Sequence, residues 1–242
     1  MANVEEDNFR IEKTSGVKKE REKLPLMKDE KEAIRKLLVP LLKEEHFVRT
    51  SVRVDRLHQK LKTEGSLSPE EISIKHPFHP DIDVLFWTKQ YSGEPTIRAS
   101  EVKYFRMRGD TVYPTIYEGL GEAFMLLTFG IDFVCLWHLF DPEIPSEIVS
   151  RYRDLTQSII SGTNSPINYQ SWLLPEIPPT PSNKQAVTKT ISDALGLAID
   201  QFKRTMFSLS VTGAMLSNPL LNRWDVKIMR SIIKKGYRMV SK

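Results

Sequence analysis

The sequence contains little cysteine and little glycine. Cys135 is the only cysteine in 242 residues, which excludes an intrachain disulfide framework and a multi-cysteine zinc site and suits a reducing compartment. Glycine occurs 11 times, well below the roughly 7% that is usual. The one close pair, Gly119 and Gly121, has neither the third glycine nor the Lys-Ser/Thr of a phosphate-binding loop, so nucleotide-binding motifs of that kind are excluded.

An uninterrupted apolar run is also missing. Residues 123–140 have the length of a membrane span, but Gly130, Asp132 and His138 interrupt them. The first 27 residues carry charges of both signs and lack the apolar segment of a signal peptide. We therefore expect a soluble, cytoplasmic protein with no membrane partner. The formal net charge of +4 is compatible with a nucleic-acid partner.

Composition divides the chain into four parts. Residues 1–27 have the mixed charge of a flexible arm. Residues 28–174 carry most of the strand and helix patterns and are expected to form the core. Residues 175–183 contain four prolines and predict an extended linker. Residues 184–242 show helical spacing of apolar residues and end in a basic segment, which predicts a helical, basic extension.

Within the core, the pattern alternates between strands and helices. A helix is expected from about residue 29 to residue 45, kinked at Pro40 because proline removes an amide donor. The helix that follows the second central strand is expected to have Pro114 at its first position. The order strand, strand, helix, strand predicts an α/β fold. The expected strands are 47–54, 81–87, 97–105 and 132–140. After the first helix, the expected helices are 55–62, 114–127, 147–160 and 223–240.

Two of the expected strands carry charged residues at alternate positions. Asp81 and Asp83 share one face of the first strand, and Glu101 and Lys103 share one face of the second. Strands adjacent in sequence are usually neighbours in the sheet, so we expect these groups to meet. Gathered carboxylates repel one another and need a positive partner. Carboxylates near a phosphate suit Mg²⁺ or Mn²⁺, and a lysine beside them suits metal-assisted phosphodiester hydrolysis.

The residues Pro80-Asp81-Ile82-Asp83 and Glu101-Val102-Lys103, on consecutive strands, resemble the motif of the PD-(D/E)xK nuclease superfamily. The resemblance covers roughly residues 28–141. It implies a restriction-endonuclease-like core, with a mixed central sheet flanked by helices, to which the helical extension is added. It also implies a nuclease, with DNA as the expected substrate, and a homodimer as one possible assembly.

The resemblance implies a role for each matching residue. Mg²⁺ or Mn²⁺ would be held by one of the two aspartates, by Glu101 and by the backbone carbonyl of Val102. Lys103 would position the attacking water. Asp81 stands in the Pro-Asp dipeptide, but Asp83 lies deeper in the strand, so we expect Asp83 to be the main ligand and Asp81 the alternative. Family members often add a glutamate from the first helix, for which Glu30 is the candidate because helical spacing places it on the apolar face. In the helix after the second strand, Glu118 and Glu122 are either a further contribution to the site or a solvated stripe.

Basic residues offer contacts to a nucleic-acid backbone in two places. One is the end of the second central strand, and the other is a stripe on the last helix, which is equally well explained as a solvated face. These residues are Arg106 and Arg108, and Arg223, Lys227, Arg230, Lys234 and Arg238.

Two other functions compete with the nuclease. His76 and His79 precede the two aspartates and would suit a histidine-carboxylate metallohydrolase, although no His-x-x-x-His pair and no cysteine partner supports a zinc geometry. The other alternative is a non-catalytic subunit on the same fold that binds nucleic acid or acts in an assembly.

Overall fold

The structure is a computed structural model that describes residues 27–43, 46–75, 81–88, 95–174, 193, 196 and 217–238. The predicted linker, nearly all of the predicted arm, and His76 and His79 lie outside the described residues. Met27, which closes the predicted arm, is fully buried. The packed part of the chain therefore includes Met27.

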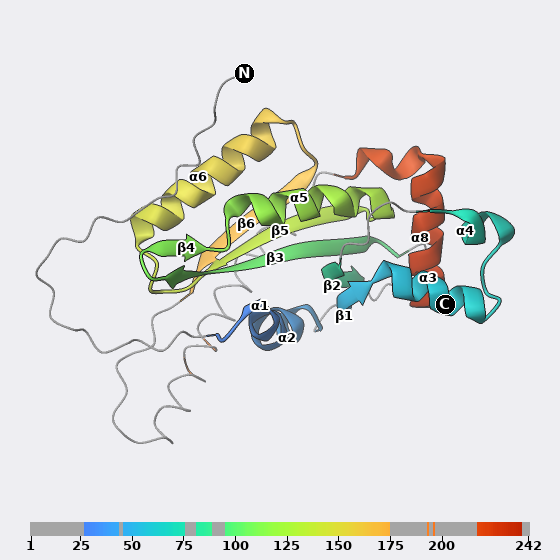
Figure 1. Cartoon of the computed structure of the whole chain (residues 1–242), viewed down its shortest axis with the longest axis horizontal. Helices are drawn as coiled ribbons and strands as arrows, with labels where there is room; N and C mark the ends of the chain where they lie inside the picture. Colours follow the sequence, from blue (N-terminus) through green and yellow to red (C-terminus); the bar gives the residue numbers. More distant parts are fainter. Residues whose placement is uncertain are drawn as a thin grey trace, which may run out of the picture.

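One mixed sheet organises the described residues (Figure 1). Its strand order is β1-β2-β3-β5-β6, and β4 pairs with the far end of β3. The pairs β1–β2, β2–β3 and β3–β4 are antiparallel, whereas β3–β5 and β5–β6 are parallel. This confirms the predicted α/β fold with a mixed sheet. The strands are β1 (His46–Arg53), β2 (Asp81–Thr88), β3 (Ile97–Arg108), β4 (Thr111–Tyr113), β5 (Phe133–Phe140) and β6 (Ile167–Leu173).

Helices flank the sheet on both sides (Figure 1). The segment formed by α1, η1 and α2 covers one face, α5 and α6 cover the other, and α8 packs with α3 and α4 beyond one end of the sheet. No helix in the described ranges is long and apolar enough to cross a bilayer. The helices are α1 (Glu30–Ala33), the π-helical η1 (Ile34–Leu38), α2 (Val39–Lys43), α3 (Val54–Thr63), α4 (Pro69–Ser73), α5 (Ile116–Leu126), η2 (Leu127–Phe129), α6 (Ser146–Gly162), η3 (Pro219–Asn222) and α8 (Trp224–Gly236).

The alternation of side chains along β3 builds a separate core on each face of the sheet. Ile97 and Ala99 pack in the cluster that includes residues of α5, whereas Val102 and Tyr104 pack in the cluster that includes residues of α1, η1 and α2. Glu101 and Lys103 are nevertheless buried between these positions. The strand therefore fixes two charged side chains within a largely apolar environment.

Three local expectations differ from the structure. Pro114 precedes the N-cap residue Thr115 and lies outside α5, so it does not open the helix. The first helix contains the π-helical turn η1 immediately before α2, the element in which Pro40 lies. β6 was not predicted, because its sequence INYQSWL mixes polar and apolar residues and most of them are only partly buried at the sheet edge.

The predicted side-chain alternation in β2 is broken at Asp83. Ile82 packs in the same cluster as Leu85 and Trp87, whereas Val84 and Phe86 pack on the opposite face. The opposing position in β1 is distorted as well, since Ser51 has a φ of 50°. Ile82 was therefore wrongly expected to share a face with Val84. The reversal falls at Asp83, opposite the distorted position of β1.

The last helix, α8, is part of the main core. Four of its buried residues join the cluster that also contains residues of α3 and α5, namely Ile228, Met229, Ile232 and Ile233. Val226 is buried as well. Gly130, at a φ of 72°, lies so close to α8 that a Cβ there would come within 2.5 Å of the Cβ of Arg230. At least this part of the predicted extension packs directly against the α/β core.

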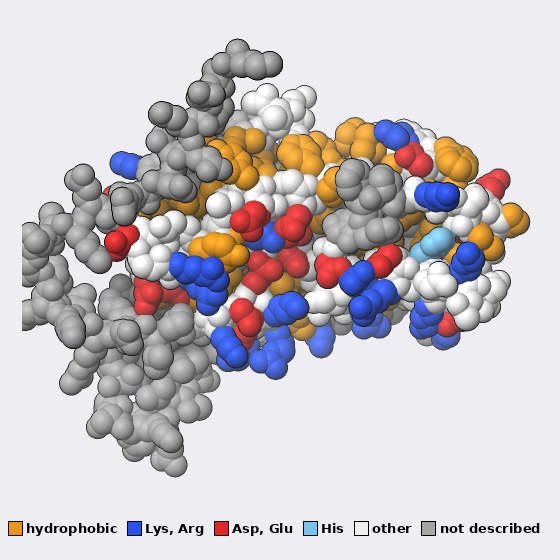
Figure 2. Space-filling model, viewed as in Figure 1, with side chains coloured by type: hydrophobic (Ala, Val, Ile, Leu, Met, Phe, Trp, Pro, Cys, Tyr) orange, Lys and Arg blue, Asp and Glu red, His pale blue; other side chains and the backbone are white. Residues whose placement is uncertain are grey.

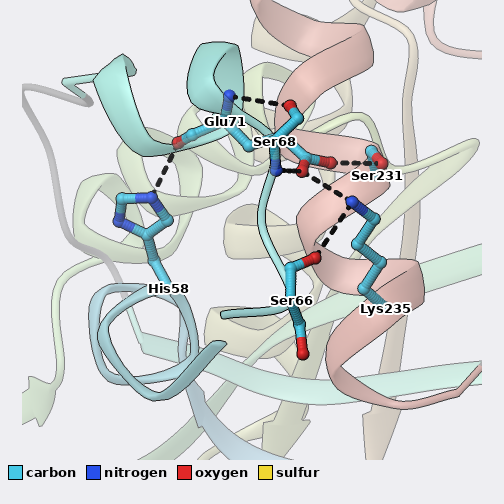
Figure 3. A network of polar contacts seen from close by, with 6 residues as sticks. All are labelled: His58, Ser66, Ser68, Glu71, Ser231 and Lys235. Carbon is cyan, nitrogen blue, oxygen red and sulfur yellow. Dashed lines mark hydrogen bonds and ion pairs between the residues drawn. The ribbon is translucent and has the colours of Figure 1, made fainter. Parts of the chain in front are cut away.

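A polar network fastens α8 to α4 (Figure 3). The buried carboxylate of Glu71 accepts hydrogen bonds from the Ser231 hydroxyl at 2.7 Å, from Lys235 Nζ at 2.6 Å and from the Ser68 backbone N–H at 2.6 Å. His58 Nε2 lies 2.8 Å from the Glu71 carbonyl. Burial opposes the charge on Glu71, but the bonds from Lys235 and Ser231 outweigh it and lower its pKa to about 2.

We expect this carboxylate to make the stability of the fold depend on pH. Because the folded-state pKa is depressed from 4.5 to about 2, the stabilisation is present above about pH 4.5 and is lost as the pH falls toward 2. Wild type should lose about 2 kcal/mol between pH 7 and pH 3 through this group. Urea unfolding of wild type and Glu71→Gln at both pH values measures the effect. Equal pH dependence in the two proteins would contradict it.

Candidate functional site

The candidate site lies where β2 and β3 separate. Their paired positions run from Trp87↔Ile97 to Val84↔Ser100 and stop there. Asp83 is the next residue of β2, and its carboxylate accepts a hydrogen bond from the Val102 N–H at 2.9 Å. A side chain thus takes the place of a ladder bond. Because the N–H and C=O of one strand residue point toward the same edge, the Val102 carbonyl is directed toward this fork as well.

Lys103 lies among carboxylates from two elements. Its Nζ is 2.7 Å from Glu101 Oε1 on β3 and 2.7 Å from Glu122 Oε2 on α5. The Lys103 side chain is 11% exposed and that of Glu101 is 3% exposed, whereas Glu122 is half-exposed at 49%. The group is therefore buried at β3 and opens toward solvent at α5. Figure 2 shows acidic side chains gathered in the middle of the molecule's face, around a cationic group.

Glu30 reaches the same group from α1. Its Oε2 is 3.8 Å from Lys103 Nζ, and its carboxylate accepts a hydrogen bond from the Tyr104 backbone. The start of α1 is held in place because the Tyr104 hydroxyl, which donates to Asp141, lies 3.4 Å from the Met27 backbone N. The structure thus brings together four predicted residues, namely Asp83, Glu101, Lys103 and Glu30.

Burial and mutual repulsion determine the protonation of these groups. Burial, followed by the charge on Asp83, raises the pKa of Glu101 to about 11, so the pair formed by Glu101 and Asp83 holds a proton at neutral pH. Its carboxyl is in hydrogen-bonding contact with those of Asp83 and Glu122. Burial also raises the pKa of Asp83, although the Val102 N–H opposes the shift. A proton and the ammonium of Lys103 together offset the negative charge of the cluster.

The remaining two ionisable groups have distinct states. Burial and the charge on Asp83 raise the pKa of Glu30 to about 7, so this carboxyl exchanges a proton near neutral pH. Burial opposes the charge on Lys103, but the carboxylates of Glu101 and Glu30 outweigh it and keep the pKa of Lys103 above its usual value. Lys103 is therefore a permanent cation.

A glycine of α5 permits the close approach of this helix to Lys103. A Cβ on Gly119 would lie 2.8 Å from Lys103 Cγ and 3.0 Å from Leu136 Cδ1. Gly121, on the same helix, has no atom within 4 Å of such a Cβ and is exposed. The distance between α5 and β3, and with it the contact between Glu122 and Lys103, depends on Gly119.

We expect Gly119→Ala to destabilise the protein by about 1–3 kcal/mol, because the new methyl group overlaps the Lys103 stem and Leu136. Gly121→Ala is the matched control, and it should be neutral or stabilising by up to about 1 kcal/mol, since alanine has the higher helix propensity. Chemical denaturation of both variants measures the difference. Equal stability of the two variants would contradict the close packing assigned to Gly119.

Other predicted residues lie apart from the cluster. Asp81 is 56% exposed and pairs with Arg53 at 3.2 Å. The prediction that Asp81 and Asp83 share one face is therefore wrong. Glu118 lies 3.2 Å from the Thr115 hydroxyl, at the exposed start of α5. Of the two acidic residues of α5, Glu122 alone reaches Lys103. The spacing of Glu118 and Glu122 in the sequence could not separate them, because the choice depends on how α5 packs.

The predicted basic contacts are largely engaged within the protein. Arg106 donates to the Lys28 carbonyl at 2.9 Å, and the Arg108 guanidinium lies 3.9 Å from the centre of the Tyr113 ring. On α8, Arg230 pairs with Asp132 at 2.9 Å and also donates to the Gly130 carbonyl.

The other basic residues of the stripe on α8 differ in exposure and in pairing. Arg223 pairs with Asp225 at 2.8 Å, Lys227 and Arg238 are exposed, and Lys234 is partly buried. Since Arg223 and Arg230 are in ion pairs, the stripe offers less positive charge to a partner than its sequence suggests.

His138 lies behind the site. It is opposite Lys103 in the β3–β5 register, and its ring contacts those of Phe105 and Tyr169. Burial and the charge on Lys103 lower the pKa of His138 to about 3. His138 is therefore a neutral, buried histidine of the core.

Comparison of the chain with protein-family models, with curated proteins and with solved structures gives no match. Within the described ranges, no three His, Cys, Asp or Glu side chains are arranged to surround a metal ion. The function is therefore inferred from the chemistry of the cluster itself.

Proposed function

We propose that this chain is a divalent-metal-dependent nuclease that hydrolyses phosphodiester bonds of nucleic acid, with DNA as the expected substrate. The observation that carries the proposal is the convergence of Asp83, Glu101 and Lys103 at the fork between β2 and β3. Buried charges of this kind, held at an opening in a sheet, are typical of functional sites. The restriction-endonuclease-like core implied by the motif is part of the same proposal.

The donor set fits Mg²⁺ or Mn²⁺. The Asp83 and Glu101 carboxyls and the Val102 carbonyl supply hard oxygen ligands directed at one fork. Two carboxyls in contact that hold a proton between them form a pair in which a cation can replace the proton. When bound, the metal would supply an acidified water and neutralise charge on the phosphate.

The chain's own residues have separate tasks. Lys103 stays protonated and is held by Glu122, so its ammonium can orient a water or stabilise negative charge on a phosphate oxygen. Glu30, with a pKa of about 7, is suited to accept a proton from a water near neutral pH. Glu122 is thereby proposed as a positioning residue for Lys103.

One observation favours the non-catalytic alternative, a subunit that binds nucleic acid on the same fold. Lys103 contacts both Glu101 and Glu122 at 2.7 Å, so a cation already lies among the carboxylates. In this alternative the lysine and a proton are the permanent counter-charges, and the site binds no metal.

Cleavage assays separate the two functions. Labelled linear, branched and single-stranded DNA, and matching RNA, are incubated with Mg²⁺ or Mn²⁺ and with wild type or Asp83→Ala. We expect wild type to cleave at least one substrate and lose this activity with EDTA, and Asp83→Ala to be inactive. If both proteins are inert on every substrate with either metal, the nuclease is excluded and the alternative is favoured.

A further inference from the structure

The candidate site is surrounded by negative charge. Glu30, Asp83, Glu101 and Glu122 meet a single ammonium, that of Lys103. Even with one carboxyl protonated, this group repels a phosphate chain at the distances over which charges act in water. A nucleic acid therefore needs cations beside the cluster to be drawn toward it.

The first helical segment separates its charges in the required way. Glu30 points inward to Lys103, whereas Lys31 and Arg35 are exposed and stand four residues apart, on one side of the helix. Lys28, just before the helix, is exposed as well. We call Lys28, Lys31 and Arg35 the basic ridge. In Figure 2, Lys and Arg side chains lie beside the acidic centre on the α1 side.

The acidic residues next to the basic ridge are already engaged. Asp29 accepts the Glu32 N–H at 2.8 Å as the N-cap of α1. Glu32 pairs with Lys36 at 2.5 Å and accepts the Lys28 backbone N–H. Within the described part of the chain, none of the three cations of the basic ridge takes part in an ion pair. Among the described residues their charge is therefore not offset by an ion pair, unlike that of Arg223 and Arg230 on α8.

The basic ridge is also fixed relative to the cluster. Arg106, at the end of β3, donates to the Lys28 carbonyl at 2.9 Å. Met27, the residue before Lys28, is fully buried. The same anchoring holds Glu30 near Lys103. A phosphate chain that contacts the basic ridge is thus placed beside the carboxylates without rearrangement of the backbone.

We propose that the basic ridge binds the sugar–phosphate backbone of the nucleic acid and so delivers one phosphate to the cluster at the β2–β3 fork. This inference rests on the proposed function, since it names the surface that receives the substrate. The contacts are to phosphates, so they contribute affinity without base preference.

The test measures binding in the absence of cleavage. A labelled 24-base-pair DNA duplex is titrated with full-length wild type, with Lys31→Ala/Arg35→Ala and with Lys60→Ala/Lys62→Ala at several salt concentrations, in EDTA. The control pair removes the same charge from exposed positions on α3. Removing two phosphate contacts should weaken binding about tenfold and reduce the slope of log K against log salt by about two. The control pair should bind within about twofold of wild type.

Each other outcome overturns the proposal. Unchanged binding by Lys31→Ala/Arg35→Ala, or an equal loss in the control pair, shows that net charge and not the basic ridge governs binding. Absence of DNA binding by wild type also overturns the proposal. Thermal unfolding of both variants verifies that they fold. Failure of the nuclease proposal is distinguishable, because it appears as missing cleavage while the selective loss of binding remains.

Discussion

Lys103→Met is expected to abolish cleavage and to leave divalent-ion binding intact. Methionine keeps an unbranched stem of similar length, so the packing of Lys103 against Gly119 is preserved. It removes the ammonium that lies 2.7 Å from Glu101 and Glu122. Loss of a preorganised donor of this kind costs about 100- to 1,000-fold in rate.

Divalent-ion binding should persist in Lys103→Met, at equal or higher affinity, because a protonated amine has no lone pair for a metal and repels it. Glu122→Gln gives the intermediate case, since it keeps the lysine but loosens its anchor. Glu118→Gln, one turn earlier on α5, is the matched control and should cleave like wild type. Full activity of Lys103→Met would remove the role assigned to this residue.

The second large effect separates two neighbouring aspartates. Asp83→Asn should lose cleavage by at least about 100-fold, since a ligand to the metal is replaced by a neutral group. Its amide oxygen can still accept the Val102 N–H, so the fold should be retained. Asp81→Asn changes an exposed residue that pairs with Arg53 and should remain within about threefold of wild type, because surface ion pairs contribute little.

Initial cleavage rates of the two variants, with circular dichroism to verify folding, measure this difference. The opposite ranking, in which Asp81→Asn is inactive and Asp83→Asn is active, would assign the metal to the Pro-Asp dipeptide. It would also contradict the placement of the site at the fork.

Much of the fold could be predicted because the central strands have clear patterns. β2, β3 and β5 are apolar segments bounded by turn residues, and α5 lies between two of them, which fixes the mixed order of the sheet. β6 could not be predicted in this way. It is an edge strand whose residues are mostly half-buried, so its sequence carries no strong alternation.

The candidate site was predictable in its residues more than in its geometry. Alternation along β3 places Glu101 and Lys103 on one face, and that was read correctly from the sequence. Alternation failed in β2, where Ile82 and Val84 face opposite sides, because the regular pairing with β1 is interrupted at Asp83, opposite Ser51 with its positive φ. Selection of Glu122 over Glu118 depends on the close packing at Gly119, which is a tertiary property.

The ion pairs of α8 show a related limit. Arg223, Lys227, Arg230 and Lys234 form a regular basic stripe in the sequence. The partner of Arg230 is Asp132, about 100 residues away, which no local pattern predicts. A charge that is neutralised in the fold is indistinguishable, in the sequence, from one that is available to a partner.

Direct titration with Mn²⁺ tests the central claim, that the β2–β3 fork is a divalent-metal site. Isothermal titration calorimetry of wild type should show saturable binding accompanied by proton release, because the pair formed by Asp83 and Glu101 holds a proton before the metal binds. Glu101→Ala and Asp83→Asn should each lose it, while Asp81→Asn should bind like wild type. Absence of Mn²⁺ binding to wild type, or binding that survives in both Glu101→Ala and Asp83→Asn, would contradict the account.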